Sequence, residues 1–204
     1  MISTEEALKR LRTGNKRFIS DSSIFNNTLS HKSRGNSLTE NQDPFAIILG
    51  CSDSRVPAEI VFDQSLGDLF SIRVAGNIVA PSQIGSVELA VERFSTRLVI
   101  IMGHSRCGAI QATIEELKCP SGTQSKNLRS IVDRIRPSFT SLDLDQTPEI
   151  LLQQAVRANI HSSVRQLEHG SIILEQLAKK GELLILGAEY SLDTGIVDFF
   201  DNLT

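Results

Sequence analysis

Three side chains that can bind a metal lie in two short motifs of similar construction. An apolar run ends at Gly50 and leads into Cys51 of CSDSR, and a second ends at Gly103 and leads into His104 of HSRC. Cys107 follows three residues after His104, so one turn of the chain offers both side chains. Two thiolates and an imidazole suit Zn²⁺ and leave one tetrahedral position open. The spacing therefore indicates a zinc site.

The competing interpretation is that each residue has an ordinary structural role. A lone cysteine is more often a small buried apolar residue, and a lone histidine is more often a hydrogen-bonded turn residue. Placement of Cys51 and His104 behind two strand-like runs favours the metal site. The third cysteine, Cys119, precedes Pro120 and is expected to be a loop thiol without a role.

A carboxylate and a guanidinium follow the first cysteine within the same motif. Asp53 and Arg55 lie two and four residues after Cys51, close enough to share its loop. Two roles for Asp53 stay open at this point. It is either a fourth zinc ligand that closes the site, or the partner of Arg55 in an ion pair that leaves the metal free for water. A surface salt bridge of little consequence is the structural alternative.

Short apolar runs alternating with helical patterns must position these motifs. Strands are predicted at 45–49, 69–74, 97–102 and 183–187, and three of these runs lack polar alternation, as strands covered on both faces do. An amphipathic helix is predicted over 3–19, and further helices over 148–168 and 171–180 and around three apolar stripes between 87 and 135. This order predicts an α/β fold with a mainly parallel central sheet flanked by helices. The carboxyl ends of such strands gather ligand groups at one edge.

Composition limits the classes of function. The chain has 204 residues, is 40% hydrophobic, and carries a net charge of −3 without a cluster of Lys and Arg. These features argue against binding of nucleic acid or of anionic membranes. The first residues have no apolar signal-peptide core, and three cysteines make a poor disulfide framework, so a cytoplasmic location is expected. A single domain over 1–204 is predicted, with an N-terminal helical arm at 1–43 and an α/β core at 44–204.

The two motifs together resemble the β-class carbonic anhydrases. Further segments also resemble this family, so the likeness spans most of the chain: ALKRLRTGNKRF, GDLFSIRVAGN and GAEYSLDTG. The resemblance implies one Zn²⁺ per chain, held by Cys51, His104 and Cys107, and reversible hydration of CO₂ to bicarbonate and a proton by zinc-bound hydroxide. It also implies that Asp53 and Arg55 form a catalytic dyad that orients the zinc-bound water, with Asp53 as the fourth ligand in a closed state.

The same resemblance suggests the state of the site and the residues that line it. One type of the family uses a Trp-containing bicarbonate pocket; this chain has no Trp, although Arg73 and Tyr190 match two other pocket positions. The other type carries a Gln nine residues before the first Cys, as Gln42 does here, so an open site is expected. Substrate-binding roles are implied for Gln42, Phe70, Ala75 and the backbone N–H of Gly108. No proton shuttle is identified; His31 is a candidate by its chemistry alone.

The family resemblance implies a homodimer or a higher homo-oligomer, with CO₂ and bicarbonate as the small-molecule partners. Three rival functions are set against it. The first is hydrolysis of carbonyl sulfide or carbon disulfide on the same scaffold. The second is a cysteine enzyme with Cys51 as nucleophile, which its C-x₃-R spacing does not favour as a phosphate cradle. The third is a structural zinc module that Asp53 closes.

Overall fold

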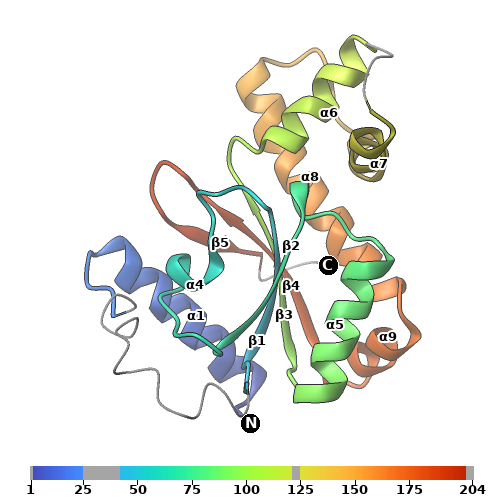
Figure 1. Ribbon diagram of the computed structural model, residues 1–204. Helices are drawn as coiled ribbons and strands as arrows, with labels where there is room; N and C mark the ends of the chain where they lie inside the picture. Colours follow the sequence, from blue (N-terminus) through green and yellow to red (C-terminus); the bar gives the residue numbers. More distant parts are fainter. Residues whose placement is uncertain (1, 25–41, 121–124, 201–204) are drawn as a thin grey trace.

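The computed structural model describes residues 2–24, 42–120 and 125–200 (Figure 1). Within these ranges a five-stranded sheet has the order β2-β1-β3-β4-β5. Its strands are β1 Ala46–Gly50, β2 Leu69–Arg73, β3 Leu98–His104, β4 Leu184–Tyr190 and β5 Val197–Phe199. Strands β1 to β4 pair in parallel, and β5 pairs antiparallel with β4. The predicted mainly parallel sheet is confirmed, and β5 is a strand that the sequence analysis did not predict.

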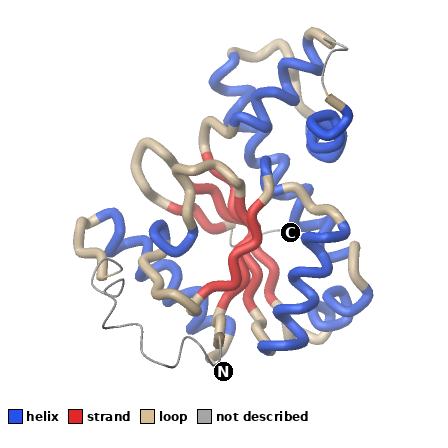
Figure 2. Tube along the Cα trace, in the orientation of Figure 1, coloured by secondary structure: helices blue, strands red, loops and turns tan. Residues whose placement is uncertain are grey.

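Helices flank both faces of this sheet, as predicted (Figure 2). The helical elements in the described ranges are α1 Thr4–Ile19, α4 Ala58–Val61, the 3₁₀ turn η1 Ala75–Asn77, α5 Pro81–Phe94, α6 Gly108–Lys118, α7 Lys126–Ile135, the 3₁₀ turn η2 Arg136–Phe139, α8 Pro148–His169 and α9 Ile172–Lys179. Helices α1 and α4 lie on one side, and α5, α8 and α9 on the other (Figure 1). Helices α6 and α7 lie beyond the carboxyl ends of the strands.

Alternating side chains of the central strands divide the core between the two faces. Ile47, Leu49 and Ile101 belong to the cluster that includes α5, α8 and α9. Ile48 and Ile100 belong to the cluster that includes α1 and α4. Because successive residues of a strand point to opposite faces, strands buried on both sides are continuous apolar runs, as β1 is and as β3 is up to its last residue, His104.

The N-terminal helix is fixed to the sheet by its polar as well as its apolar side chains. The Ser3 side chain caps α1 by accepting a hydrogen bond from the Glu6 N–H at 3.1 Å. Asn15 is buried and donates to the carbonyls of Val61 and Gly195, while its own oxygen accepts from the Val197 N–H. These bonds join α1 to α4 and to β5.

The predicted N-terminal arm is only partly described. Residues 25–41, which belong to this arm and include His31, lie outside the described residues. In the described part of the chain, none of the helices has both the length and the apolarity needed to span a membrane.

Candidate metal centre

The structure brings Cys51, His104 and Cys107 together beyond the carboxyl ends of β1 and β3. These strands are neighbours, with Gly50 paired to Met102. Cys51 is the first residue after β1, His104 is the last residue of β3, and Cys107 precedes α6. Their ligand atoms all lie within 4.8 Å of one another, and all three residues are buried.

The imidazole of His104 is oriented by a backbone carbonyl. Its Nδ1 lies 2.9 Å from the Ser105 carbonyl oxygen, so Nδ1 carries the proton and donates it. The lone pair is then on Nε2, a buried atom with no hydrogen-bond partner among the described residues. A buried lone pair beside two thiols is what a metal ligand requires, and an N–H···O=C bond at the other nitrogen is its usual support. The donor set therefore fits Zn²⁺.

The two thiols are hydrogen-bonded to each other, and this contact shifts their pKa values in opposite directions. Their sulfur atoms lie 3.9 Å apart, and the hydrogen bond from Cys107 lowers the pKa of Cys51 to about 4. The same hydrogen bond, together with burial, raises the pKa of Cys107 above its usual range. The backbone N–H groups of Ile110 and Ala109, in the first turn of α6, act in the opposite direction on Cys107 because they favour its thiolate.

Asp53 is paired with Arg55, as the sequence analysis expected for an open site. The Arg55 Nε and backbone N–H donate to Oδ1 at 2.9 and 3.0 Å, and a terminal nitrogen donates to Oδ2 at 2.7 Å. This fork holds the pKa of Asp53 well below its usual range, so the carboxylate is ionised. Its Oδ2 lies 3.9 Å from His104 Nε2, which places the negative charge at the edge of the ligand cluster.

Arg73 holds the loop between Cys51 and Asp53 from the end of β2. Its Nε donates to the Cys51 carbonyl at 3.0 Å, and its terminal nitrogen donates to the Asp53 carbonyl. The sequence analysis considered Arg73 and Tyr190 only as positions of a bicarbonate pocket. In the structure the Arg73 guanidinium is engaged with the ligand loop, and Tyr190 is a buried residue of β4.

The residues predicted to bind substrate divide into two groups by position. Ala75 begins η1, next to Gly76, whose N–H lies 3.4 Å from the Cys51 sulfur. Gly108 begins α6 beside Cys107, and nothing lies within 4 Å of the place where a Cβ would stand on it. Both are therefore adjacent to the ligand cluster. The N–H of Gly108 also lies in the first turn of a helix, where backbone N–H groups have no intrahelical hydrogen-bond partners.

Gln42 and Phe70 lie at the opposite end of the strands from the cluster. Gln42 is exposed and precedes β1, and the nearby Pro44 carbonyl accepts a hydrogen bond from Thr96, just before β3. Phe70 is paired in register with Ile47, near the amino end of β1, and its ring packs against Phe94 with centroids 6.0 Å apart. Because a strand rises about 3.3 Å per residue, neither side chain reaches the metal centre of its own chain.

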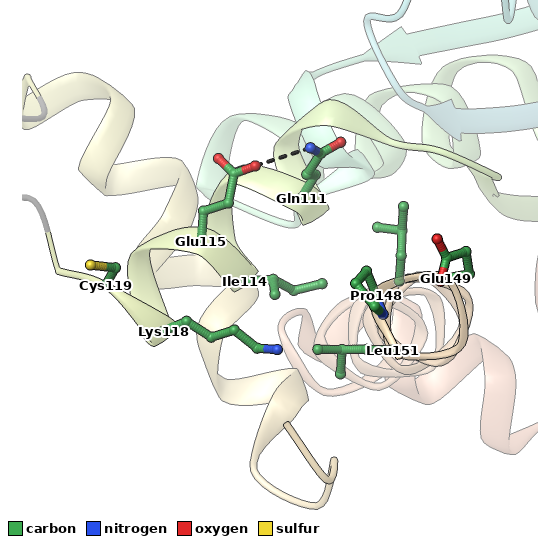
Figure 3. Close-up of a pocket in the computed structure, with 9 residues that line it drawn as sticks. Gln111, Ile114, Glu115, Lys118, Cys119, Pro148, Glu149 and Leu151 are labelled. Carbon is green, nitrogen blue, oxygen red and sulfur yellow. Dashed lines mark hydrogen bonds between the residues drawn. The ribbon is translucent and has the colours of Figure 1, made fainter. Parts of the chain in front are cut away.

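Cys119 lies away from the centre, at the other end of α6. It lines an open pocket of about 440 Å³ between α6 and the start of α8 (Figure 3). The pocket is lined by Gln111, Ile114, Glu115, Lys118, Cys119, Pro148, Glu149, Leu151 and Leu152. Since an 11-residue helix is about 16 Å long, the Cys119 thiol is well separated from Cys107 at the start of the same helix.

Comparison of this chain with known proteins agrees with the interpretation of the ligand cluster as a metal centre. A family model described as carbonic anhydrase matches residues 46–197. A solved structure described as the β-carbonic anhydrase CcaA has a TM-score of 0.73 and 25% identity, over 96% of this chain and 92% of that one. The chain belongs to the β-carbonic anhydrase family. Among its relatives, the carbonic anhydrase of Mycolicibacterium smegmatis is 36% identical over 207 residues, covering 97% of this chain and 93% of that protein.

A second solved structure shows the same β-carbonic anhydrase fold at lower sequence identity. It is one of two tetrameric β-carbonic anhydrases from Sordaria macrospora, with a TM-score of 0.74 and 21% identity, over 87% of this chain and 90% of that one. These family relatives are enzymes, which confirms the enzyme class that the motifs predicted.

Proposed function

We propose that this chain catalyses the reversible hydration of CO₂ to bicarbonate and a proton, with one Zn²⁺ held by Cys51, His104 and Cys107. The observation that carries this proposal is the convergence of two thiols and the unpartnered Nε2 of His104 beside a carboxylate that Arg55 holds. Zinc held there would supply the nucleophile, because it would bring the pKa of a water molecule close to 7. Held by three protein ligands, the metal would keep a position open for that water.

Asp53 orients the nucleophile in this proposal. Its carboxylate is ionised and accepts a hydrogen bond from the attacking oxygen, which points the lone pair of that oxygen at the CO₂ carbon. The fork from Arg55 keeps both carboxylate oxygens occupied and so keeps Asp53 from becoming a fourth ligand. Arg73 supports this arrangement by fixing the carbonyls on either side of the loop.

Substrate is held by groups beside the ligands. The N–H of Gly108 donates to the developing bicarbonate, and the Ala75 methyl group contributes to an apolar wall that suits uncharged CO₂. Gln42 donates a further hydrogen bond, and Phe70 extends the apolar wall. Because both lie at the far end of their own strands, we assign them to the metal centre of a neighbouring chain.

A homo-oligomer is therefore part of the proposal. The Sordaria macrospora relatives are described as tetrameric, and our assignment of Gln42 requires at least a dimer. We further propose that the described residues belong to one domain over 1–204, with the α/β core at 44–204. A cytoplasmic location is proposed because the three cysteines are free thiols.

Stopped-flow CO₂ hydration by zinc-loaded protein, followed from acid to alkaline pH, tests this function. We expect turnover that rises through neutrality. Asp53 is not the group that titrates in this range, because Arg55 keeps its pKa far lower. Fully zinc-loaded protein without turnover at any pH would overturn the proposal, and would point to a structural zinc site or to a sulfur analogue of CO₂ as substrate.

The Asp53→Asn variant tests the role given to the carboxylate. We expect kcat/KM to fall about a hundredfold at unchanged zinc content, because an amide is a poor acceptor for the orienting bond. Asp193→Asn is the matched control, since Asp193 forms an exposed ion pair with Arg106 at 2.8 Å, outside the ligand cluster. Wild-type turnover in Asp53→Asn would contradict the assigned role.

A further inference from the structure

The turn after β2 lies beside the Cys51 sulfur, and its backbone has an unfavourable conformation that the surrounding structure must stabilise. Gly76 has φ 66°, and Asn77 has φ 43°, so two successive residues lie in the left-handed region. A Cβ on Gly76 would lie 2.8 Å from Ile135 Cδ1 and 3.1 Å from Ala109 Cβ, so only glycine fits. Left-handed residues in series persist where the surrounding structure holds them.

This conformation aims one N–H group at a candidate zinc ligand. The Gly76 N–H donates to the Cys51 sulfur at 3.4 Å, in a buried environment. A hydrogen bond to a thiolate withdraws electron density from the sulfur. The strength of that bond therefore controls how much charge Cys51 transfers to a bound metal, which is the function of outer-shell partners in metal sites.

Two side chains of α8 hold the turn from the opposite side. The Asn159 Nδ2 donates to the Gly76 carbonyl at 2.8 Å, and the Ser163 hydroxyl donates to the Asn77 carbonyl at 3.1 Å. Both side chains are buried, with residue exposures of 2%. They lie four positions apart, on one face of the helix, so both reach the same turn.

Close packing fixes α8 itself relative to the metal centre. Ile160 lies so near Gly103 that a Cβ there would stand 2.6 Å from two of its atoms, and Gly103 directly precedes His104. The helix that holds the Gly76 turn is therefore also seated on the strand that carries the histidine. A displacement of the turn relative to α8 changes the sulfur contact while the histidine strand stays in place.

We propose that Asn159 and Ser163 are positioning residues that hold the Gly76 N–H on the Cys51 sulfur, and so set the charge that this thiolate donates to the metal. The inference rests on the proposed metal centre and adds to it two residues that bind neither metal nor substrate. Both act through the Gly76 and Asn77 carbonyls.

Cobalt-substituted protein tests this inference without relying on CO₂ turnover. The variants are Asn159→Leu and Ser163→Ala, and the readouts are the thiolate-to-cobalt charge-transfer band and the cobalt affinity measured by competition with a chelator. We expect the band to shift to lower energy in both variants, because the sulfur loses a donor. We expect the affinity of Asn159→Leu to fall about tenfold.

The matched control is Ser162→Ala, on the same helix and next to Ser163. Ser162 is also buried, but its hydroxyl accepts from Gln166. A merely structural role of Asn159 and Ser163 would lower thermal stability and leave the band where the wild type has it. Folded variants that keep the wild-type charge-transfer band and a cobalt affinity within twofold of the wild type would overturn the proposal. If Asn159→Leu does not fold, the band of Ser163→Ala alone decides the question.

The failure of the inference is distinguishable from failure of the proposed function. Wild-type protein that binds cobalt without a thiolate band would overturn the metal centre, and this inference with it. Wild-type protein that shows the band but does not hydrate CO₂ would overturn only the proposed reaction, and the comparison between Ser163→Ala and Ser162→Ala would still decide the positioning role.

Discussion

The imidazole of His104 donates through Nδ1 to the Ser105 carbonyl, and this bond decides which nitrogen keeps its lone pair. Beside that lone pair, the hydrogen bond between the two thiols lowers the pKa of Cys51 and raises that of Cys107, so Cys107 is the thiol that keeps its proton to higher pH. A metal that binds both sulfurs must displace the proton of Cys107. Metal affinity at this centre is therefore expected to rise with pH.

Replacing Cys107 and Cys119 one at a time tests which of them binds the metal. We expect Cys107→Ala to be purified without zinc, because two remaining protein ligands do not make a stable tetrahedral site. The exposed Cys119 provides the control, since Cys119→Ala is expected to keep one zinc per chain. Zinc is measured by elemental analysis of both proteins. Full occupancy in Cys107→Ala would refute the ligand assignment.

The ligand cluster was predictable from the sequence because its residues directly follow, or end, neighbouring strands. Cys51 and His104 stand where two buried apolar runs stop, and parallel neighbours bring such positions together. Asn159 and Ser163 carry no comparable signal, since they look like ordinary polar positions in a long helix. Their partners are 83 and 86 residues away, and nothing in the local pattern predicts that contact.

At the scale of elements, the predictable strands are those covered on both faces. β1 and β3 are fully buried, so they are continuous apolar runs in the sequence. β5 was missed because it has three residues, of which one is exposed. Gly14 lies within α1, where glycine lowers helix propensity. In the structure a Cβ there would lie 1.7 Å from the Phe62 carbonyl oxygen, so glycine allows α1 to approach α4.

Glycine-to-alanine substitutions in two helices test this close approach. We expect Gly14→Ala to lower the free energy of unfolding by about 1–3 kcal/mol, because the collision outweighs the gain in helix propensity. In α5, Gly85 has nothing within 4 Å of its Cβ position, so Gly85→Ala is expected to raise stability by about 0.5–1 kcal/mol. Urea denaturation measures both values. A stabilised Gly14→Ala would show that α1 does not pack as described.

At the scale of the whole molecule, the proposed active centre is complete only in an oligomer. Gln42 and the metal ligands lie at opposite ends of the same strands, so the proposed contact of Gln42 with substrate requires a second copy of the chain. The size of the particle in solution is the first check. A species of the monomer mass, 22.4 kDa, with full activity would contradict this arrangement.

Mixing two impaired variants tests the same point more sharply. Gln42→Ala and Asp53→Asn are each expected to reduce CO₂ hydration when assayed alone. Combined in equal amounts with exchange of subunits, they are expected to restore about a quarter of the centres, since a mixed dimer pairs an intact Asp53 with the partner's intact Gln42. Each variant carried through the same exchange alone is the control. A mixture no more active than its components would show that Gln42 does not serve a neighbouring centre.

The bonds of Asn15 have a consequence for the order in which the protein forms during synthesis. Its side chain bonds to Gly195 and Val197, which are 180 and 182 residues later in the chain. A ribosome therefore releases α1 long before the residues that satisfy this asparagine exist. Contacts between such distant residues form late, because the loop between their ends must first close. The contact between the first helix made and the last strand is thus expected to be among the last native contacts to form.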